Sequence, residues 1–519
     1  MSLANNPIFL THQRLVRRGG LLAPVLLAAV ISLCFVANPL LARLNPDNYR
    51  GFYHESPQLA GLNSYGWLLG IEMIVLILGG FNRIAQSLSE DRKAGLWESN
   101  LLTPLRPQAI VAGYWLAPAL REVCMAAVMA GAGLLTLLIV GLPWWLWLAT
   151  QVLVISTALL AGLFGVLAGM VLTRNQIVPI LLLLIFSATT WFAAPDTLVT
   201  NLILPVSGIH HLFVSQTLGL HDNSYMMDYV GDPKLFGWHV HPLLLTLVLQ
   251  ALLATFLWRA LIRRTARPFG SLFLRWEAVT LFGLLAWVQN ALLWSVWSGQ
   301  FPAVNGSRPS YIMQGPFLPF LQAGEIFVGL ALLGGAAAMP EKVRLQALRQ
   351  GGGNLGVALR QSALPLALIL AGIAALGLLS QIMFNLNGTG LSAFLVASIN
   401  LLEIYVIFAL MVEFCRLNHQ RRAMGFMILW IFVLVVIPLI LGALFESAEL
   451  ARLSLVAPGF IALADPEHAD WTMLHWAIFL HFVVAVLFYL AWSTRWNRLF
   501  QQTAKSPAPP GMPPVPPVA

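Results

Sequence analysis

The chain has 519 residues, of which 59% are hydrophobic and 10% are charged, and its formal net charge is +8. This composition excludes an ordinary soluble globule, in which about 25% of the residues are charged. Apolar runs of about 20 residues, long enough to cross a bilayer as a helix, recur along the chain. The weakly alternating segments of an outer-membrane barrel are not seen. The sequence therefore predicts an all-α integral membrane protein.

The first element in chain order is a basic, amphipathic segment before the first apolar run. Ile8, Phe9 and Leu10 alternate there with Arg14 and other basic residues. We expect this segment to lie along the inner membrane surface as a helix. Twelve apolar runs follow that are expected to span the lipid bilayer: 21–41, 66–86, 112–140, 146–172, 177–194, 241–262, 278–298, 318–338, 363–384, 391–415, 423–445 and 472–494.

The basic residues are distributed unequally between the two sides of these spans. Most of the 29 Lys and Arg residues fall in loops that lie inside if the N-terminus is inside, and the outer loops hold only Arg43, Arg50, Lys234, Arg308 and Arg452. This asymmetry predicts that both termini are cytoplasmic. The positive charge is therefore explained by topology and does not indicate nucleic-acid binding. The three cysteines fall in or beside apolar runs, so no disulfide framework is predicted.

The loop after the second run is the most informative part of the sequence. Residues 89–103 contain a cluster of charges, then Trp97, Leu101 and neighbouring leucines, and Pro104 ends the pattern. A buried helix would not carry so many charges, and a linker would not carry the apolar group at helical spacing. We therefore expect a short amphipathic helix at the membrane surface.

This loop resembles the one after the second span in permeases of the ABC-2 type, the export branch of the ATP-binding-cassette transporters. The residues that carry the resemblance are Asp91, Arg92, Gly95, Glu98, Leu101 and Pro104. Lys93, Leu96 and Asn100 depart from the family pattern.

The resemblance implies that this loop is a coupling helix on which a cytoplasmic ABC ATPase subunit docks, in two copies per transporter. Trp97 and Leu101 would then supply an apolar anchor, and Gly95 would allow close approach of the backbones. The chain has no Walker-type phosphate-binding sequence, so ATP and Mg would be bound by the partner and no cofactor by this chain. The chain itself is then a transport subunit of the cell (inner) membrane and not an enzyme. The sequence does not decide whether further membrane subunits join this complex.

The second half of the chain repeats features of the first. Glu72 lies in the second run and Glu325 in the eighth, each before a charged inner loop. An apolar Pro-Gly segment also recurs before the last run of each half, with Pro205 and Gly208 in 202–220 and with Pro458 and Gly459 in 455–464. Both segments are too short to span and too apolar for free loops, which favours re-entrant or interfacial outer hairpins.

These repeats predict two parallel six-helix halves fused in one chain, each with a cytoplasmic coupling helix and an outer hairpin. The expected domains are 1–268 and 269–500, followed by a disordered Pro-rich tail at 501–519. The second coupling segment, 339–360, contains Glu341 and Arg344 but lacks the Gly-x-x-Glu core, so the two docking sites are expected to be unequal.

Glu72 and Glu325 are the candidate residues of a translocation pathway. A charged residue costs roughly 2.5–3.5 kcal/mol at a helix centre on insertion scales, so both are expected to face the protein interior. A structural hydrogen bond to a neighbouring helix explains them equally well, and for Glu403 and Glu413 it is the preferred explanation.

Other functions are possible for a chain of this kind, and the sequence supports them to different degrees. The cluster of His210, His211, His221, Asp222, Asp228, His239 and His241 lacks a tight ligand spacing, so no metal site is predicted. No paired carboxylates or metalloprotease motif suggest a membrane enzyme. A secondary transporter of the major-facilitator kind is the main alternative, since its DRxG motif is similar to the DRKAG of this loop. A membrane scaffold worked by an ATPase is another. The apolar spans allow lipids, drugs, peptides or polymers as substrate.

Overall fold

The computed structural model describes residues 6–18, 20–44, 57–171, 203–205, 208–209, 211–213, 234–235, 238–267, 271–297, 317–336, 359, 362–384, 391–418, 429–444, 453–464 and 470–505. The chain divides into two compact units: the first comprises Met1–Lys234 and Trp238–Pro268, and the second comprises Leu235–Gly237 and Phe269–Ala519. That these units are two permease halves stays a prediction.

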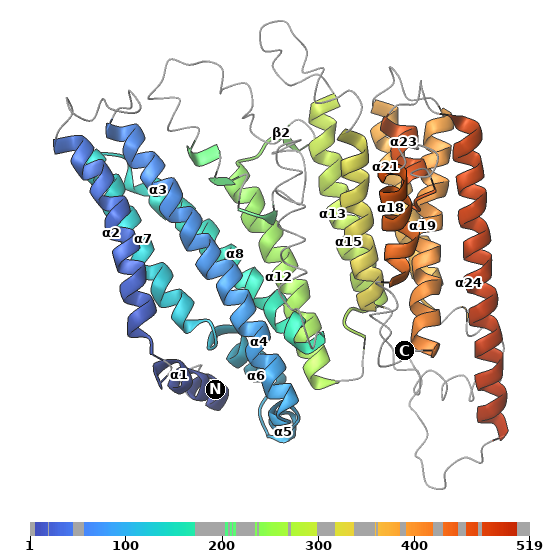
Figure 1. The fold of residues 1–519 in the computed structure, drawn as a ribbon, viewed down its shortest axis with the longest axis horizontal. Coiled ribbons are helices and arrows are strands. Elements are labelled where there is room, and N and C mark those ends of the chain that lie inside the picture. The colour runs from blue at the N-terminus through green and yellow to red at the C-terminus, as the bar shows by residue number, and fades with distance from the viewer. Residues whose placement is uncertain are drawn as a thin grey trace, which may run out of the picture. The chain divides into compact units, whose positions relative to one another are not determined.

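The first unit is built of helices (Figure 1). In chain order these are α1 (Pro7–Arg18), α2 (Leu22–Leu44), α3 (Pro57–Met73), the π-helix η3 (Ile74–Gly79), α4 (Gly80–Lys93), α5 (Leu96–Leu102), α6 (Pro107–Leu116), α7 (Leu120–Val140), α8 (Trp144–Val171) and α12 (Pro242–Ala266). Two short strands, β1 (Lys234–Leu235) and β2 (Trp238–His239), precede α12.

The second unit is also helical. Its elements are α13 (Arg275–Trp297), α15 (Phe317–Ala336), α18 (Leu364–Phe384), α19 (Leu391–Asn418), the π-helix η6 (Phe432–Val436), α21 (Ile437–Leu444), α23 (Ala457–Ala464) and α24 (Trp471–Lys505). α24 continues past residue 500, where the sequence predicted the tail to begin.

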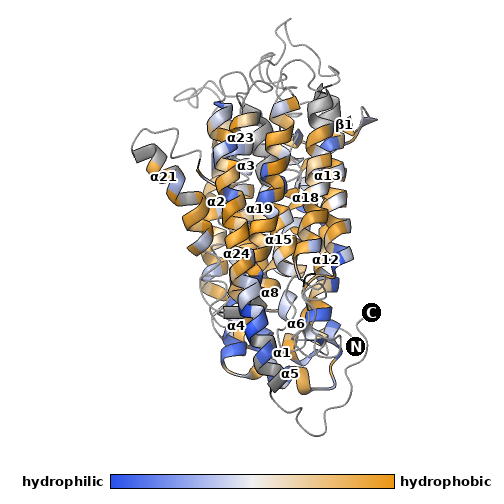
Figure 2. Ribbon diagram, turned by 90° about the vertical axis from the view of Figure 1, so that its right-hand side faces the viewer, coloured by the Kyte–Doolittle hydropathy of each residue, from blue (hydrophilic) through white to orange (hydrophobic). Residues whose placement is uncertain are grey.

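Within the described residues, seven helices are long and apolar enough to cross a membrane. They are Leu22–Leu44, Pro57–Lys93, Leu120–Val140, Trp144–Met170, Pro242–Ala266, Leu391–Cys415 and Trp471–Arg498. Figure 2 shows hydrophobic residues along most of the length of the long helices. The protein is therefore an all-α, multi-pass membrane protein. The expected span 177–194 lies outside the described residues.

The expected third span, 112–140, is divided in the structure. α6 ends at Leu116 and α7 begins at Leu120, with Pro118 between them. Proline lacks the amide hydrogen that would continue the helix, and it forces the chain to turn here. At its other end α7 stops at Gly141, whose φ of 77° is readily adopted only by glycine.

The second spanning helix is longer than a bilayer requires. α3, η3 and α4 form one continuous helix, Pro57–Lys93, of 37 residues. At 1.5 Å per residue it is about 55 Å long, whereas the hydrocarbon core measures about 30 Å. Its ends must therefore project from the bilayer. Asp91 and Arg92 belong to this projecting helix and not, as the sequence suggested, to a separate surface helix; only Leu96–Leu102 forms that separate helix.

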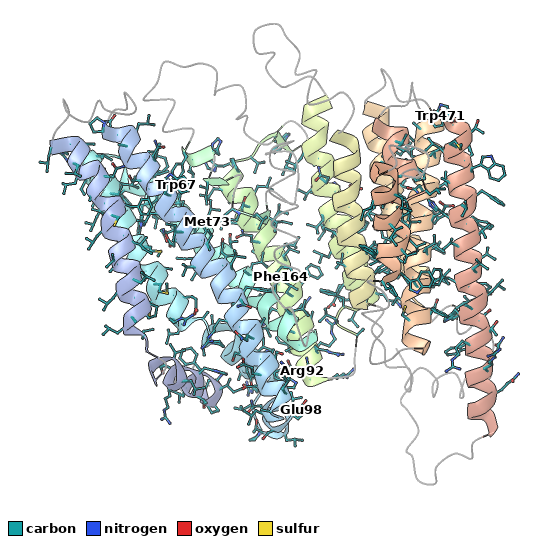
Figure 3. The ribbon with its side chains drawn as sticks, viewed as in Figure 1. Trp67, Met73, Arg92, Glu98, Phe164 and Trp471 are labelled. Carbon is teal, nitrogen blue, oxygen red and sulfur yellow. The ribbon has the colours of Figure 1, made fainter. Side chains whose placement is uncertain are left out.

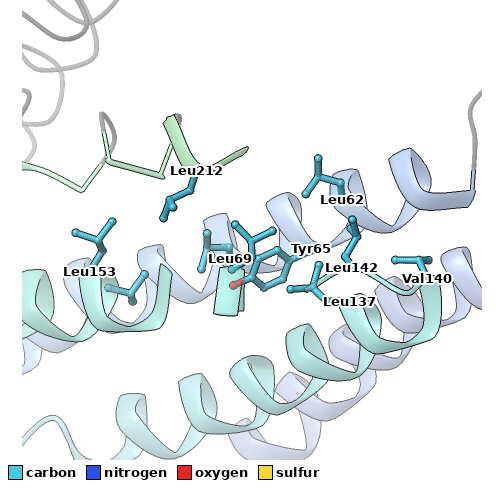
Figure 4. Packing of buried hydrophobic residues seen from close by; sticks show 10 residues of the cluster. Leu62, Tyr65, Leu69, Leu137, Val140, Leu142, Leu153 and Leu212 are labelled. Carbon is cyan, nitrogen blue, oxygen red and sulfur yellow. The ribbon is translucent and has the colours of Figure 1, made fainter. Parts of the chain in front are cut away.

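The core of the first unit lies where α3, α7 and α8 meet. Tyr65 of α3 is fully buried there, its hydroxyl is hydrogen-bonded to Thr150 of α8, and its ring stacks on Phe213 with 5.7 Å between centroids. Apolar side chains surround it (Figure 4), namely Leu62, Leu69, Leu137, Val140, Leu142, Leu146, Leu153, Val154 and Leu212. Because lipid is as apolar as leucine, close packing and hydrogen bonds hold these helices together.

In the second unit α19 packs against α15, α18, α23 and α24. Tyr405 of α19 is fully buried and donates a hydrogen bond to the backbone carbonyl of Glu325 on α15 at 3.2 Å. Gly329, one turn further along α15, makes room for the phenol, since a Cβ there would lie 1.9 Å from the hydroxyl oxygen. The absence of a side chain at this glycine therefore sets the approach of the two helices.

Candidate functional site

The α4–α5 junction, residues 87–104, holds most of the predicted coupling residues. α4 ends at Lys93, where the amides of Ala94 and Gly95 donate to the carbonyls of Glu90 and Arg92 at 2.9 and 3.2 Å. Gly95 has φ of 73°, and nothing lies within 4 Å of where its Cβ would be. Glycine is thus needed here for its left-handed conformation, which ends α4 and redirects the chain into α5.

A polar network fixes the junction to α1 and α6. The Tyr114 hydroxyl donates to Asp91 Oδ2 at 2.7 Å, and Asn100 Nδ2 donates to the Tyr114 hydroxyl at 3.0 Å. His12 Nε2 of α1 lies 3.6 Å from the same Asp91 oxygen. Burial, and next the Asp91 carboxylate, raise the pKa of the Tyr114 phenol, which keeps it a donor at neutral pH. The Asp91 carboxylate of α4 therefore joins α1 and α6, and α5 is joined to them through the Tyr114 hydroxyl.

Trp97, one of the two predicted anchor residues, packs within its own unit. Only 7% of its surface is exposed, and its ring lies against Tyr114 at 5.5 Å between centroids, so it holds α5 against α6. The exposed apolar residues of α5 are Leu96, 52% exposed, and Leu102, 88% exposed. Leu101 is half-buried, and Glu98 and Pro104 are exposed. Figure 3 labels Glu98 and Arg92 in this region.

Arg92 connects the junction to α8. Its guanidinium donates to the carbonyl of Gly169 at 3.1 Å and also to that of Met170, at the C-terminal end of α8. Carbonyls at a helix end lack intrahelical partners, and a basic side chain satisfies both their hydrogen bonding and the helix dipole. The Cβ of an alanine at Gly165 or Gly169 would lie 2.9 or 2.8 Å from a backbone oxygen of α4. The two helices thus touch backbone to backbone.

Of the second predicted coupling segment, 339–360, only residue 359 is described. Glu341 and Arg344 lie outside the described residues, as does the whole of 340–358.

Glu72, the first predicted pathway residue, lies in the core of the first unit. It is 2% exposed, and Gln151 Nε2 of α8 donates to its Oε2 at 3.0 Å. Tyr65, two turns earlier on α3, bonds the preceding residue of α8, Thr150. Glu72 is therefore one of a pair of polar contacts that join α3 to α8.

Glu325 occupies a similar place in the second unit but is bonded differently. It is 9% exposed, and among the described residues its Oε1 has no hydrogen-bond partner. Both carboxylate oxygens face Gly377 of α18. A Cβ added at Gly377 would lie 3.6 and 3.8 Å from these two oxygens and 3.0 Å from Asn290 Nδ2 of α13. The two glutamates thus share burial, and each lies on a helix that is bonded to α8 or α19.

The first predicted hairpin is described in part, and we call it the 203–213 segment. Pro205 and Gly208 are buried, and the amide of Ile209 donates to the Pro205 carbonyl at 2.9 Å. A Cβ at Gly208 would lie 2.9 Å from Leu153 of α8, so the segment packs directly on that helix. Gln250 of α12 donates to the Ile203 carbonyl at 2.7 Å.

The second predicted hairpin, which we call the 453–464 segment, is described throughout and contains α23. Pro458 and Gly459 are buried. Asn400 of α19 donates to the Leu455 carbonyl at 2.9 Å and accepts from the Gly459 amide at 3.1 Å. Both segments therefore dock on the helix predicted as the fourth span of their half.

Metal ligands do not cluster in the described part of the chain, where no group of three or more His, Cys, Asp or Glu could hold an ion. His211 and His241 lie near each other, with 5.4 Å between ring centroids. His210, His221, Asp222 and Asp228 lie outside the described residues.

Comparisons of the chain with protein families, with curated proteins and with solved structures find no match.

Several residues that shape these sites were not singled out from the sequence. His12, Tyr114, Gln151 and Asn400 contact their partners from helices distant in the chain. The one signal that could have found them is that each is a polar residue within or beside an apolar run, where such residues usually have a partner.

Proposed function

We propose that this protein is the membrane-spanning permease of an ABC exporter, which moves a substrate across the cytoplasmic (inner) membrane with ATP hydrolysed by a separate ATPase subunit. In this proposal twelve spans form two parallel halves, both termini are cytoplasmic, and each half has a coupling element and an outer re-entrant hairpin.

The observation that carries the proposal is the exposed face of α5. Leu96 and Leu102 present apolar side chains beside the Glu98 carboxylate, at the end of a helix that is too long to be contained in the bilayer. A leucine that is 88% exposed on α5, beyond the charged end of that projecting helix, is not explained by contacts within its own unit. An apolar side chain rimmed by charges is typical of an anchor for a protein partner.

The contacts around α5 would allow a movement of α5 to be transmitted to α4 and α8. Trp97 and Asn100 fix α5 to Tyr114, and Tyr114 holds Asp91 of the long Pro57–Lys93 helix. Arg92 then hydrogen-bonds that helix to the end of α8, and at the glycines of α8 the two backbones are in direct contact. Motion of α5 would therefore move α4 and α8 together. The 203–213 segment docks on α8 further along, which extends the path to the proposed outer end.

The two units support the proposed duplication through matching contacts. α8 and α19 are both 28 residues long. Counted from each helix start, Leu153 and Asn400 occupy the same position, and each contacts the glycine of its Pro-Gly segment, Gly208 or Gly459. Matching contacts at equivalent helix positions are expected of parallel repeats.

The test uses Leu102 and the full-length protein purified from its native membranes in mild detergent. We expect ATP hydrolysis to copurify with the wild-type chain. Leu102→Glu should release it, because truncating or charging an anchor residue costs about 2 kcal/mol or more, roughly a 30-fold loss of affinity. Leu102→Met keeps the apolar contact and should retain the activity. Equal ATPase content in all three preparations would contradict docking on this face.

A further inference from the structure

The 453–464 segment is hydrogen-bonded to three helices of its unit, α19, η6 and α24; we call each of these contacts a tie. Asn400 of α19 bonds Leu455 and Gly459. The π-helix η6 accepts the Leu455 amide at its Leu434 carbonyl, at 2.9 Å, and the Ser454 hydroxyl at its Val435 carbonyl, at 3.0 Å. A π-helix displaces backbone carbonyls from the regular α-helical pattern, which leaves them available for such contacts.

The third tie comes from α24 through His481. Its Nε2 lies 3.1 Å from the Leu453 carbonyl oxygen, and its Nδ1 lies 3.6 Å from Glu403 Oε2 of α19. His481 is 5% exposed and Glu403 is 8% exposed. Neither His481 Nδ1 nor Glu403 Oε2 has a hydrogen-bond partner in the described part of the chain, and the two atoms lie next to each other. Asn400, one turn earlier on α19, also interacts with the Glu403 carboxyl group.

The geometry of this tie requires a proton. A carbonyl oxygen can only accept, so His481 Nε2 must carry a hydrogen to bond Leu453. In neutral histidine Nδ1 then has a lone pair, and it would face a carboxylate oxygen that also has only lone pairs. One proton between them removes the conflict, either on the carboxyl group or on the imidazole. Without it, one oxygen of a buried carboxylate would face a lone pair and no donor, which is unfavourable.

The first unit has the same tie without a titratable group. Ser156 of α8 occupies the position that Glu403 occupies in α19, and its hydroxyl is hydrogen-bonded to Gln250 of α12. Gln250 in turn donates to the Ile203 carbonyl of the 203–213 segment at 2.7 Å. The neutral pair Ser156–Gln250 thus holds one segment, and the pair Glu403–His481 holds the other.

We propose that Glu403 and His481 form a buried proton-binding site whose single shared proton keeps the 453–464 segment docked on α19 and α24. Loss of that proton at alkaline pH weakens the tie and loosens the segment. The first unit, with its Ser156–Gln250 pair, does not respond to pH in this way. The inference does not depend on which substrate the protein moves or on what drives the movement.

The other titratable groups around the site are few. Among the elements packed on α19, α18 and the 453–464 segment carry no titratable side chain, and α15 carries Glu325. α19 itself also contains Tyr405, which bonds the Glu325 backbone, and Glu413, which accepts from the Ala363 amide near the end of the helix, where Cys415 and Arg416 follow. α24 also carries His475, which is exposed and bonded to the Trp471 carbonyl, and, toward its other end, Tyr489, Arg495, Arg498 and Lys505.

The experiment measures amide hydrogen exchange in the purified full-length protein between about pH 6 and pH 9. Rates are expressed as protection factors, which divides out the intrinsic effect of pH on exchange. The reporters are the Leu455 and Gly459 amides of the docked segment, and the Ile209 amide of the first unit is the reference in the same sample. We expect protection of the reporters to fall about tenfold or more toward pH 9, a tenfold change being what one unit of pKa difference gives. Protection of Ile209 should stay constant.

Two variants separate proton binding from general loosening. In Glu403→Gln a side-chain amide can donate permanently to His481 Nδ1, so protection should no longer depend on pH. The double variant Glu403→Ser with His481→Gln copies the Ser156–Gln250 pair of the first unit, and its protection should likewise not depend on pH. A flat profile in the wild-type protein would overturn the proposal, as would a pH dependence that persists in Glu403→Gln.

Discussion

Replacing Gly95 tests whether the α4–α5 junction depends on backbone conformation or on free space. Its φ of 73° places it in the left-handed region, which costs a residue with a Cβ roughly 1–2 kcal/mol. Alanine also restricts the unfolded chain, which offsets about 0.4–1 kcal/mol of that cost. Gly95→Ala should therefore destabilise the junction by about 1 kcal/mol. Because nothing lies within 4 Å of the Cβ position, Gly95→Leu should cost about the same, and Gly95→Asn should cost less.

The measurement is hydrogen exchange at the Ala94 and Gly95 amides, which bond Glu90 and Arg92 at the end of α4. A loss of about 1 kcal/mol should lower protection roughly fivefold in the Ala and Leu variants, with the Asn variant closer to wild type. The reasoning would be refuted if leucine were far worse than alanine, since that would mean the side chain meets a neighbour. It would also be refuted if asparagine gave no recovery.

Two further changes address the helix contact and the buried acids. Gly169→Ala should lower the free energy of unfolding of the purified protein by about 1–3 kcal/mol, because the added methyl group would press on the α4 backbone. Gly131→Ala on α7 is the control: nothing lies within 4 Å of its Cβ position, so the change should be neutral or stabilising. Glu72→Gln and Glu325→Gln should each lower transport while leaving the amount of protein in the membrane unchanged; unchanged flux in both would assign these residues a structural role only.

The sequence was most informative about the membrane class and the positions of several long helices. The apolar runs predicted spans at 21–41 and 146–172, and the structure has helices at Leu22–Leu44 and Trp144–Met170. Composition suffices for such segments because a bilayer demands a fixed apolar length. The amphipathic helix expected before the first span is also found, as α1.

The sequence was less informative where one residue could serve two purposes. Trp97 reads as an anchor for a partner because it is large and apolar in a charged loop, yet Tyr114 covers it. Nothing local in the chain shows that α6 folds back on α5. Similarly, the sequence does not show that Gly95 adopts a left-handed conformation, which is visible only in its φ of 73°.

The partners of buried polar residues could not be predicted either, because they lie on helices that are distant in the chain. Glu72 stands out in the sequence as an acid in an apolar run, but Gln151 lies in another helix and is one of several candidates. Pairing Glu403 with His481 likewise requires knowing how α19 and α24 are rotated about their axes. Span order alone does not give that rotation.

The most direct test of the proposed function is photo-crosslinking from position 102 in intact cells. A photoreactive residue in place of Leu102 should form an adduct with a protein that contains Walker nucleotide-binding sequences, identified by mass spectrometry. The same residue in place of Leu391, which is 73% exposed on α19, serves as the control and should not form that adduct. No ATPase adduct at 102, in cells where the chain is correctly inserted, would contradict the exporter account and favour a transporter driven without ATP.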